Sequence, residues 1–258
     1  MHYKIAAMTL PIQSVWSDSY NVHWSDADAK GDASIISLFN YLQESAIRNA
    51  EHLGLGYDAA LELKQIWVIV RMQLEVMRYP HWGETIEVRT WPRGVEGLYA
   101  LRDYEILDGK GLLIAAAASR WIVLDTITRN PVPVNILEEV LHLCDPRKAI
   151  ALPSTSRMPT GEFILLKKYI VQYSDLDKHN HVNNTRYVEW VVNAFPGNWL
   201  NSHEIGEFRI DYNGESYQDD EIAIYAEQPG EMNTWIKAVR IRDQKIIFKA
   251  LVNWRICS

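Results

Sequence analysis

Four side chains able to move protons lie close together in the second half of the sequence: Asp175, Asp177, His179 and His181. Carboxylates and imidazoles can activate water as general bases, and they are also common metal ligands. The segment has neither the HExxH nor the CxxC spacing of metal-binding motifs. We therefore expect hydrolytic chemistry here, with no metal and no cofactor, and keep a metal site as the alternative.

An earlier segment of the chain repeats this one without the histidines. Residues 20–28 have the sequence YNVHWSDAD and residues 169–177 the sequence YIVQYSDLD, so that Tyr, Val, Ser and both Asp match in order. At the same spacing, Asp32 stands where His181 stands. The repeat predicts a duplicated fold in which only the second copy has kept its chemistry.

The aspartates common to both copies have a simpler role open to them. Asp26 matches Asp175, and Asp28 matches Asp177. Short carboxylates favour turns and helix caps, because they accept hydrogen bonds from nearby backbone N–H groups. We expect Asp26 and Asp175 to serve the fold, and Asp177 to combine a structural role with a chemical one.

Each copy leads into a helix and then into a series of strands. One helix is predicted between Ser34, its N-cap, and Gly54, and a second helix ends at Pro196-Gly197. Strand patterns follow at residues 67–77, 85–91, 98–107 and 112–124, and at residues 205–212, 221–227, 234–242 and 246–256. Strands joined by short turns predict an antiparallel sheet.

This order of elements predicts an α+β protein of two tandem hotdog domains, each an antiparallel sheet wrapped around a long central helix. We place the N-terminal domain at residues 1–135, a proline-containing linker at 136–160 and the C-terminal domain at 161–258. Two such domains in one chain would form an internal pseudo-dimer. A homodimer of whole chains stays open.

Composition narrows the partners and the compartment. The formal net charge of −7 argues against nucleic-acid binding. The two cysteines, Cys144 and Cys257, match no metal or redox motif, which favours a reduced, cytoplasmic protein. The N-terminal residues lack the pattern of a signal peptide, and no apolar run is long enough for a membrane span.

Further motifs run through both halves in a fixed order. In the first half they are Trp67–Met72 (WVIVRM), Arg78–Gly83 (RYPHWG), Thr90-Trp91, Arg120-Trp121 and Thr128-Arg129. In the second half they are Ser174–Asn184 (SDLDKHNHVNN) with Tyr187, and Asp211-Tyr212 with Glu215. Together they resemble the acyl-acyl-carrier-protein thioesterases, the plant FatA/FatB type and their bacterial relatives.

The resemblance implies hydrolysis of fatty acyl-[acyl carrier protein] thioesters, which releases free fatty acid and ends chain elongation in fatty acid synthesis. The implied partner is acyl carrier protein carrying the acyl chain. The implied catalytic residues are Asp177, His179, His181 and Glu215, with Asn180, Asn183 and Asn184 as possible support. The family has asparagine where this chain has His179, so either His179 or Asn180 takes its orienting role. Ser216 stands where many relatives have cysteine, which excludes a cysteine nucleophile at that position.

Thioester hydrolysis needs an activated water and a stabilised oxyanion, whereas the thiolate leaves readily. Our hypothesis makes Glu215 the general base and His181 the group that orients the water or shares its proton. Asp177 would fix the tautomer of His181 or tie down the loop. Unpaired N–H groups of residues 182–184 would face the oxyanion, and Asn183 or Asn184 would cap the helix. The acyl tunnel is expected in the first half, from residues 35–53 and 67–77.

Other functions fit the same fold. One is an acyl-CoA thioesterase, and another is a non-catalytic acyl-binding protein. The latter predicts loss of the polar cluster from both halves, and the residues at 175–181 with Glu215 argue against it. A dehydratase is a weaker possibility, because the sequence shows no strong matching helix signature.

Overall fold

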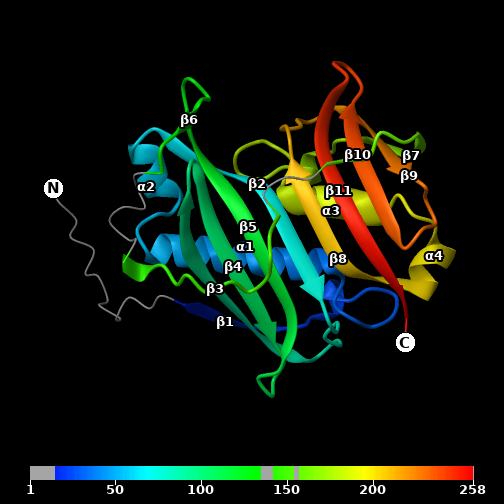
Figure 1. Cartoon of the computed structure of the whole chain (residues 1–258), viewed down its shortest axis with the longest axis horizontal. Helices are drawn as coiled ribbons and strands as arrows, with labels where there is room; N and C mark the ends of the chain where they lie inside the picture. The colour runs from blue at the N-terminus through cyan, green and yellow to red at the C-terminus, as the bar shows by residue number, and fades with distance from the viewer. Residues whose placement is uncertain (1–14, 135–141, 154–156, 258) are drawn as a thin grey trace.

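The computed structural model describes residues 15–134, 142–153 and 157–257. Its strands form one 11-stranded antiparallel sheet through both halves, in the order β1-β3-β4-β5-β2-β8-β11-β10-β9-β7 with β6 beside β5 (Figure 1). The first half contributes β1 (Trp16–Asn21), β2 (Gln65–Val76), β3 (Thr85–Glu96), β4 (Tyr99–Leu107), β5 (Leu113–Asp125) and β6 (Pro131–Val132). The second contributes β7 (Phe163–Ile170), β8 (His203–Tyr212), β9 (Glu221–Glu227), β10 (Asn233–Arg240) and β11 (Lys245–Ile256).

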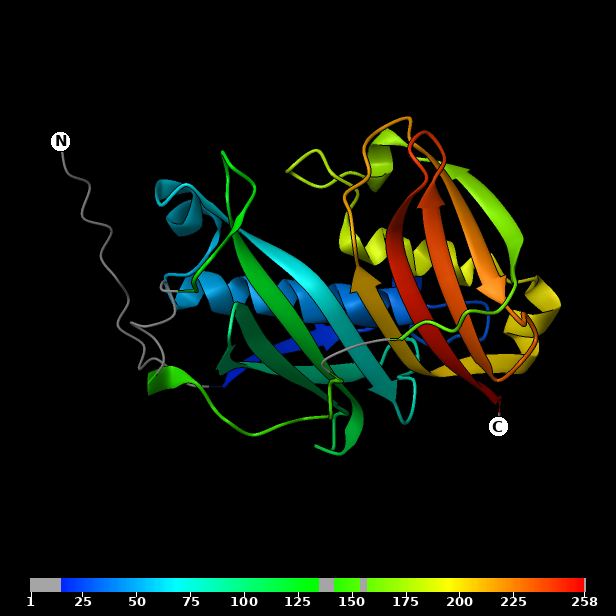
Figure 2. The same cartoon turned by 45° about the horizontal axis from the view of Figure 1, so that its top comes forward.

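The helices pack against one face of this sheet (Figures 1 and 2). They are α1 (Ile35–His52), α2 (Tyr57–Glu62), α3 (Asn184–Val192) and α4 (Gly197–Ser202). The 3₁₀ turns η1 (Trp24–Asp26) and η3 (Tyr173–Asp175) precede α1 and α3. None of the described helices is long and apolar enough to cross a membrane. The predicted α+β architecture with an antiparallel sheet is confirmed.

The two halves meet where β2 pairs with β8. Arg71 lies opposite Asp211 in this antiparallel register, and their side chains form an ion pair across the seam. The Tyr79 hydroxyl also reaches across the seam and donates a hydrogen bond to the carbonyl of Ile205 at 2.9 Å. Because the sheet is continuous, one hydrophobic cluster of buried side chains extends through both halves around α1 and α3.

Capping sets the start of both central helices. The Ser34 hydroxyl accepts from the N–H of Ser37 at 3.1 Å, and the Asn183 side chain accepts from that of Thr185 at 3.0 Å. Helix α1 runs for 18 residues and α3 for 9. The second helix is half the length of the first. Pro196 contributes to this, because proline disfavours helical backbone in the residue before it. Its apolar pattern continues into α4 instead.

Strand β3 is longer than the pattern at residues 85–91 predicted. It continues through Pro92 and Gly94 to Glu96, and its register with β4 shifts between Pro92 and Gly94. Proline and glycine end most strand patterns, but a β-bulge accommodates both, because it breaks the regular hydrogen bonding there. The predicted strand ends at the bulge, whereas the observed strand continues beyond it.

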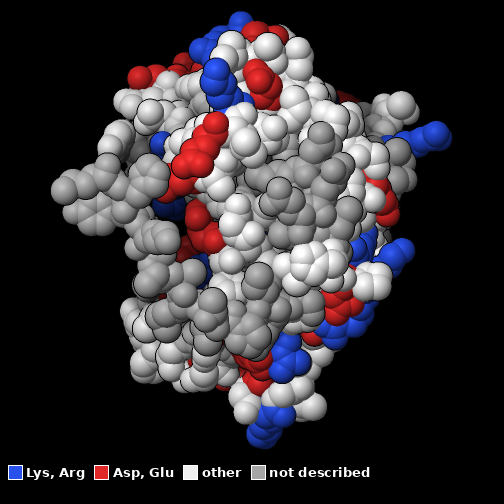
Figure 3. All heavy atoms as spheres, turned by 90° about the vertical axis from the view of Figure 1, so that its left-hand side faces the viewer, with Lys and Arg blue, Asp and Glu red and all other residues white. Residues whose placement is uncertain are grey.

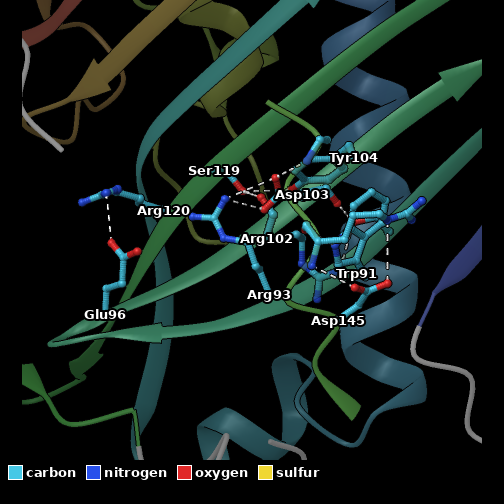
Figure 4. Close-up of polar contacts among 12 residues, drawn as sticks. Trp91, Arg93, Glu96, Arg102, Asp103, Tyr104, Ser119, Arg120 and Asp145 are labelled. Atoms are coloured by element: carbon cyan, nitrogen blue, oxygen red, sulfur yellow. Dashed lines mark hydrogen bonds and ion pairs between the residues drawn. The ribbon is translucent and has the colours of Figure 1, made fainter. Parts of the chain in front are cut away.

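The predicted linker, residues 136–160, is partly outside the described residues, but residues 142–153 lie along β3 and β4. The Trp91 indole donates to the carbonyl of Arg147, and the N–H of Ala149 donates to the Asp103 carboxylate, each at 3.0 Å. Asp103 also pairs with Arg93 at 3.1 Å, and both side chains are buried (Figure 4). This part of the segment is fastened to the sheet rather than crossing freely over it.

Candidate active site

A cavity of about 950 Å³ lies between the first half and the polar segments of the second. Helix α1, strand β2 and strand β5 supply mostly apolar walls, including Ala46, Ala50 and Trp67. The rest of the lining includes residues 177–179, 181–184 and 212–215, and Arg129. A mostly apolar space lined in part by polar groups suits an apolar chain that carries a polar reactive group. Residues from both expected ranges, 35–53 and 67–77, line this cavity, and their role as an acyl tunnel stays a prediction.

The repeated aspartates hold the backbone of the turn that carries the histidines. Asp175 accepts from the N–H of Gln172 at 2.8 Å, and its counterpart Asp26 accepts from that of His23 at 2.9 Å. The predicted capping role of Asp26 and Asp175 is confirmed. Asp177 accepts from the N–H of His179 at 2.8 Å, which makes an Asx turn. Of the two roles considered for Asp177, this contact favours tying down the loop.

His181 and Glu215 are brought together from different segments. The Nδ1 atom of His181 lies 3.5 Å from Oε1 of Glu215. The Tyr217 hydroxyl donates to Oε2 of Glu215 at 3.1 Å, and the Tyr217 ring packs edge-on to His181 with centroids 5.0 Å apart. Burial and the neighbouring carboxylate raise the pKa of Tyr217, so its hydroxyl stays protonated and available as a donor.

Arg129 completes this cluster from the first half. Its guanidinium forms an ion pair with Oε1 of Glu215. Arg129 stands in a motif of the family resemblance, and neither Arg129 nor Tyr217 was predicted as a site residue. Arg129 is 86 residues from Glu215, so no local spacing connects the two. Tyr217 follows Glu215 by two residues, and its aromatic ring at the edge of a polar segment was the available signal.

His179 contacts a different element from His181. It lines the cavity, and its ring packs edge-on to Tyr57 of α2 with centroids 5.0 Å apart. Burial lowers the pKa of His179, which favours the neutral ring. Asn180 is exposed and holds the left-handed backbone of the turn, with φ +59°. Between these two, the geometry favours His179 as the residue that meets a ligand.

The predicted oxyanion donors are mostly occupied. The N–H of Val182 donates to the carbonyl of Ser216 at 3.0 Å, and that of Asn183 to the carbonyl of Asp175 at 2.9 Å. The expectation that these two N–H groups are unpaired is wrong, because the neighbouring segments pair with them. Within the described residues, the N–H of Asn184 has no acceptor, and Asn184 lines the cavity.

The metal alternative finds no geometric support. Among the described residues, no group of three or more His, Cys, Asp and Glu side chains is close enough to hold a metal ion. Asp177 turns its carboxylate to the backbone, and Ser216 is fully buried. His181 and Glu215 are a pair of titratable side chains that meet at the cavity.

A sheet wrapped against central helices in two repeated halves, with one polar cluster lining a mostly apolar cavity, defines a tandem hotdog protein. Family models named "Acyl-ACP thioesterase N-terminal domain" and "Acyl-ACP thioesterase C-terminal domain" match residues 13–143 and 161–256. The chain belongs to the acyl-ACP thioesterase family.

Curated relatives and solved structures agree with this family. The chain is 32% identical, over 80% of its length, to a palmitoyl-acyl carrier protein thioesterase of Gossypium hirsutum, and covers 53% of it. It is 30% identical, over 73% of its length, to an oleoyl-acyl carrier protein thioesterase of Arabidopsis thaliana, and covers 56% of it. The chain thus spans little more than half the length of these relatives.

Two solved structures share the fold over nearly their whole length. An acyl-ACP thioesterase from Bacteroides thetaiotaomicron covers 94% of this chain, which covers 98% of it, with a TM-score of 0.84 at 24% identity. A 12:0-ACP thioesterase from Umbellularia californica gives the same coverages, with a TM-score of 0.83 at 22% identity. At these identities the likeness shows the fold, and the predicted tandem hotdog architecture is confirmed.

Proposed function

We propose that the protein hydrolyses fatty acyl thioesters carried by acyl carrier protein and releases free fatty acid. The observation that carries this proposal is the His181–Glu215 pair at a mostly apolar cavity of about 950 Å³. The relatives are named for oleoyl- and palmitoyl-acyl carrier protein, which supports the substrate class. Release of the fatty acid would end chain elongation in fatty acid synthesis.

In the proposed reaction, Glu215 takes a proton from a water molecule as the water oxygen bonds to the thioester carbonyl carbon. His181, 3.5 Å from the Glu215 carboxylate, orients that water or shares the proton. The carbonyl oxygen becomes an oxyanion, for which the N–H of Asn184 at the start of α3 is a donor. When the carbonyl re-forms, the C–S bond breaks and the thiolate takes up a proton.

Asp177 and His179 complete the proposed catalytic set without touching Glu215. Asp177 holds the turn through the N–H of His179, and His179 presents a largely neutral ring to the cavity. We propose that His179 takes the orienting role of the family asparagine. Asn183 supports the site by capping α3, and Asn180 by its turn conformation.

The pairing of the two halves is proposed to be an internal pseudo-dimer, in which the first half binds the acyl chain and the second carries the chemistry. The continuous β2–β8 seam supports this. The domain limits 1–135 and 161–258, a cytoplasmic location and a homodimer stay predictions.

On the face seen in Figure 3, acidic and basic side chains alternate, and the described residues there form no continuous basic patch for an acidic carrier protein.

The test is a chain-length series of matched acyl thioesters on acyl carrier protein and on coenzyme A, read by thiol release. We expect a higher kcat/KM on the carrier-protein series, with turnover lost in Glu215→Gln and His181→Ala. Preference for coenzyme A would point to the acyl-CoA alternative. Absence of thiol release from every chain would favour a binding protein.

A further inference from the structure

Arg129 is a residue of the first half that contacts the proposed base directly. Among the described residues, it is the only lysine or arginine that forms an ion pair with Glu215. It comes from the turn between β5 and β6, on the opposite side of the β2–β8 seam from Glu215. The site therefore depends on both halves through a side-chain contact as well as through the cavity wall.

The turn that presents Arg129 is built by one carboxylate. Oδ1 of Asp125 accepts from the N–H groups of Ile127 and Thr128 at 2.9 and 2.7 Å, and from the Thr128 hydroxyl at 3.1 Å. Arg129 follows with φ +59°, a backbone conformation that non-glycine residues seldom adopt. Its own N–H donates to the carbonyl of Asp125 at 2.9 Å. The direction of the Arg129 side chain is thus set by local backbone bonds.

The contacts of Glu215 show what Arg129 adds. The Glu215 carbonyl is held by Arg240 at 2.8 Å, and Oε2 of its side chain by the Tyr217 hydroxyl. Oε1 is shared between Arg129 and His181. Tyr217 alone would leave the carboxylate free to turn about its last bond, because one hydrogen bond does not fix a plane. Arg129 supplies the second point and keeps Oε1 towards His181.

We propose that Arg129 is a positioning residue that holds the Glu215 carboxylate in its working orientation. This rests on the proposed role of Glu215. Both side chains are partly exposed, with 42% and 31% of their surface accessible, so the pair is too well solvated to be a strong source of stability. Its effect falls on orientation, and general-base catalysis depends steeply on orientation.

The experiment compares Arg129→Gln, Arg129→Lys and Arg89→Gln on an acyl carrier protein thioester, with thermal unfolding of each variant. Arg89 pairs with Glu87 at closely matched exposure, 40% and 35%, on β3 away from the cavity. We expect Arg129→Gln to lower kcat about 10- to 100-fold with little change in KM. Arg129→Lys retains part of the rate, and Arg89→Gln retains all of it.

A mutant cycle separates positioning from a general structural effect. Glu215→Asp shortens the side chain, which withdraws the carboxylate from Arg129 while leaving a measurable rate. In that background, Arg129→Gln should lower kcat by less than about 2-fold, because the contact is already lost. Equal losses of kcat in both backgrounds, or a wild-type kcat in Arg129→Gln, would overturn the proposal.

A variant of the supporting turn gives an independent check. Asp125→Ala removes the acceptor of the Ile127 and Thr128 N–H groups. We expect this variant to show part of the loss of kcat that Arg129→Gln shows. The double variant should lose no more kcat than Arg129→Gln alone. The proposed function fails separately: Glu215→Gln with wild-type turnover would remove Glu215 from the mechanism. An inactive Glu215→Gln beside a fully active Arg129→Gln would refute only the role of Arg129.

Discussion

The turn at residues 24–33 and the turn at residues 173–182 have the same backbone and different chemistry. In the first, the N–H of Asp28 donates to the carbonyl of Asp32 at 2.8 Å, and in the second that of Asp177 donates to the carbonyl of His181 at 2.8 Å. The carboxylates of Asp28 and Asp177 each accept a backbone N–H two residues on, again at 2.8 Å in both. In both turns, the shared backbone conformation is stabilised by aspartate carboxylates that accept hydrogen bonds from backbone N–H groups.

The side chains around the matching positions 32 and 181 differ. Asp32 forms an ion pair with His81 in the first half, where the second half has His181 packed against Tyr217. The residue two before His81 is Tyr79, which is buried at the seam, and the residue two before Tyr217 is Glu215. The proposed catalytic cluster and an ion pair thus occupy equivalent places, and the side chains alone decide which is formed.

The spaces beside the two central helices also differ. At the spacing of the repeat, Ala46 and Ala50 of the first half correspond in sequence to Phe195 and Trp199 of the second. The small residues line the cavity of about 950 Å³, whereas the aromatic pair lines a space of only about 140 Å³. Both rings pack edge-on to Trp254, with centroids 4.8 and 5.9 Å away. The first half has the larger space because its long helix carries small residues, Ala46 and Ala50, at the cavity.

The largest expected effect comes from making the second turn resemble the first. His181→Asn puts a side chain of nearly the shape of Asp32 beside Glu215 without adding a charge. We expect kcat to fall about 10²- to 10⁴-fold, since proton handling at the site is lost, while the melting temperature stays close to that of the wild type.

The matched control is Asp32→His, which places a histidine in the first turn and should leave kcat unchanged. Near-wild-type turnover in His181→Asn would remove the chemical difference between the two turns. Activity loss with Asp32→His would show that the first turn takes part in catalysis after all.

Exchanging the residues beside the helices should give the next largest effect. Ala46→Phe fills part of the cavity, so the longest accepted acyl chain loses contacts worth about 0.8 kcal/mol per methylene. Loss of two or three methylenes lowers kcat/KM on that chain about 10- to 100-fold, with short chains little affected. An unchanged chain-length profile would mean that the acyl chain does not lie along α1.

The reciprocal exchange should change stability instead of specificity. Phe195 is buried against Trp254, so Phe195→Ala leaves a void and costs about 3–5 kcal/mol of unfolding free energy. Denaturant unfolding measures this loss, and the chain-length profile of the folded enzyme should not move. A loss below about 1 kcal/mol would show that the aromatic cluster is loosely packed.

The paired aspartates should give a smaller effect that separates frame from chemistry. Asp28→Ala and Asp177→Ala each remove one acceptor of a backbone N–H, which costs about 0.5–1.5 kcal/mol of unfolding free energy. Only Asp177→Ala should also lower kcat, by several-fold, because it loosens the turn that carries His181. Equal kcat in the two variants would place Asp177 wholly in the frame.

The sequence predicted what is local or repeated. The constant spacing of the two Asp-containing segments located both turns and both helix starts, because those structures are made by bonds between residues a few positions apart. Strand β9 was predicted at its observed bounds, Glu221–Glu227. The likeness of Asp26 to Asp175 was enough to assign both to a role in the fold.

What escaped prediction depends on partners distant in the sequence. The N–H groups of Val182 and Asn183 looked unpaired because helix starts usually leave them so, but one of them bonds to Ser216, from a segment far along the chain. The contact of Arg129 with Glu215 crosses the seam, and nothing near either residue points to the other. The length of α3 was masked by an apolar pattern that runs on into α4.

The smallest expected effect concerns the protonation of His179 in the second turn. Burial lowers the pKa of His179, so the folded protein holds it neutral at a pH where the unfolded chain, with a pKa of about 6.5, already binds the proton. As the pH falls through that range, the unfolded state gains protons and the folded state loses stability. His179→Asn removes this linkage. As the pH is lowered from 8 to 5.5, the melting temperature of the variant should therefore rise relative to that of the wild type. The rise should be small, because the ring is only partly buried. His23→Asn, at an exposed histidine in the first turn, serves as the control, and an equal shift in both variants would mean that the position of His179 beside Tyr57 does not restrain its protonation.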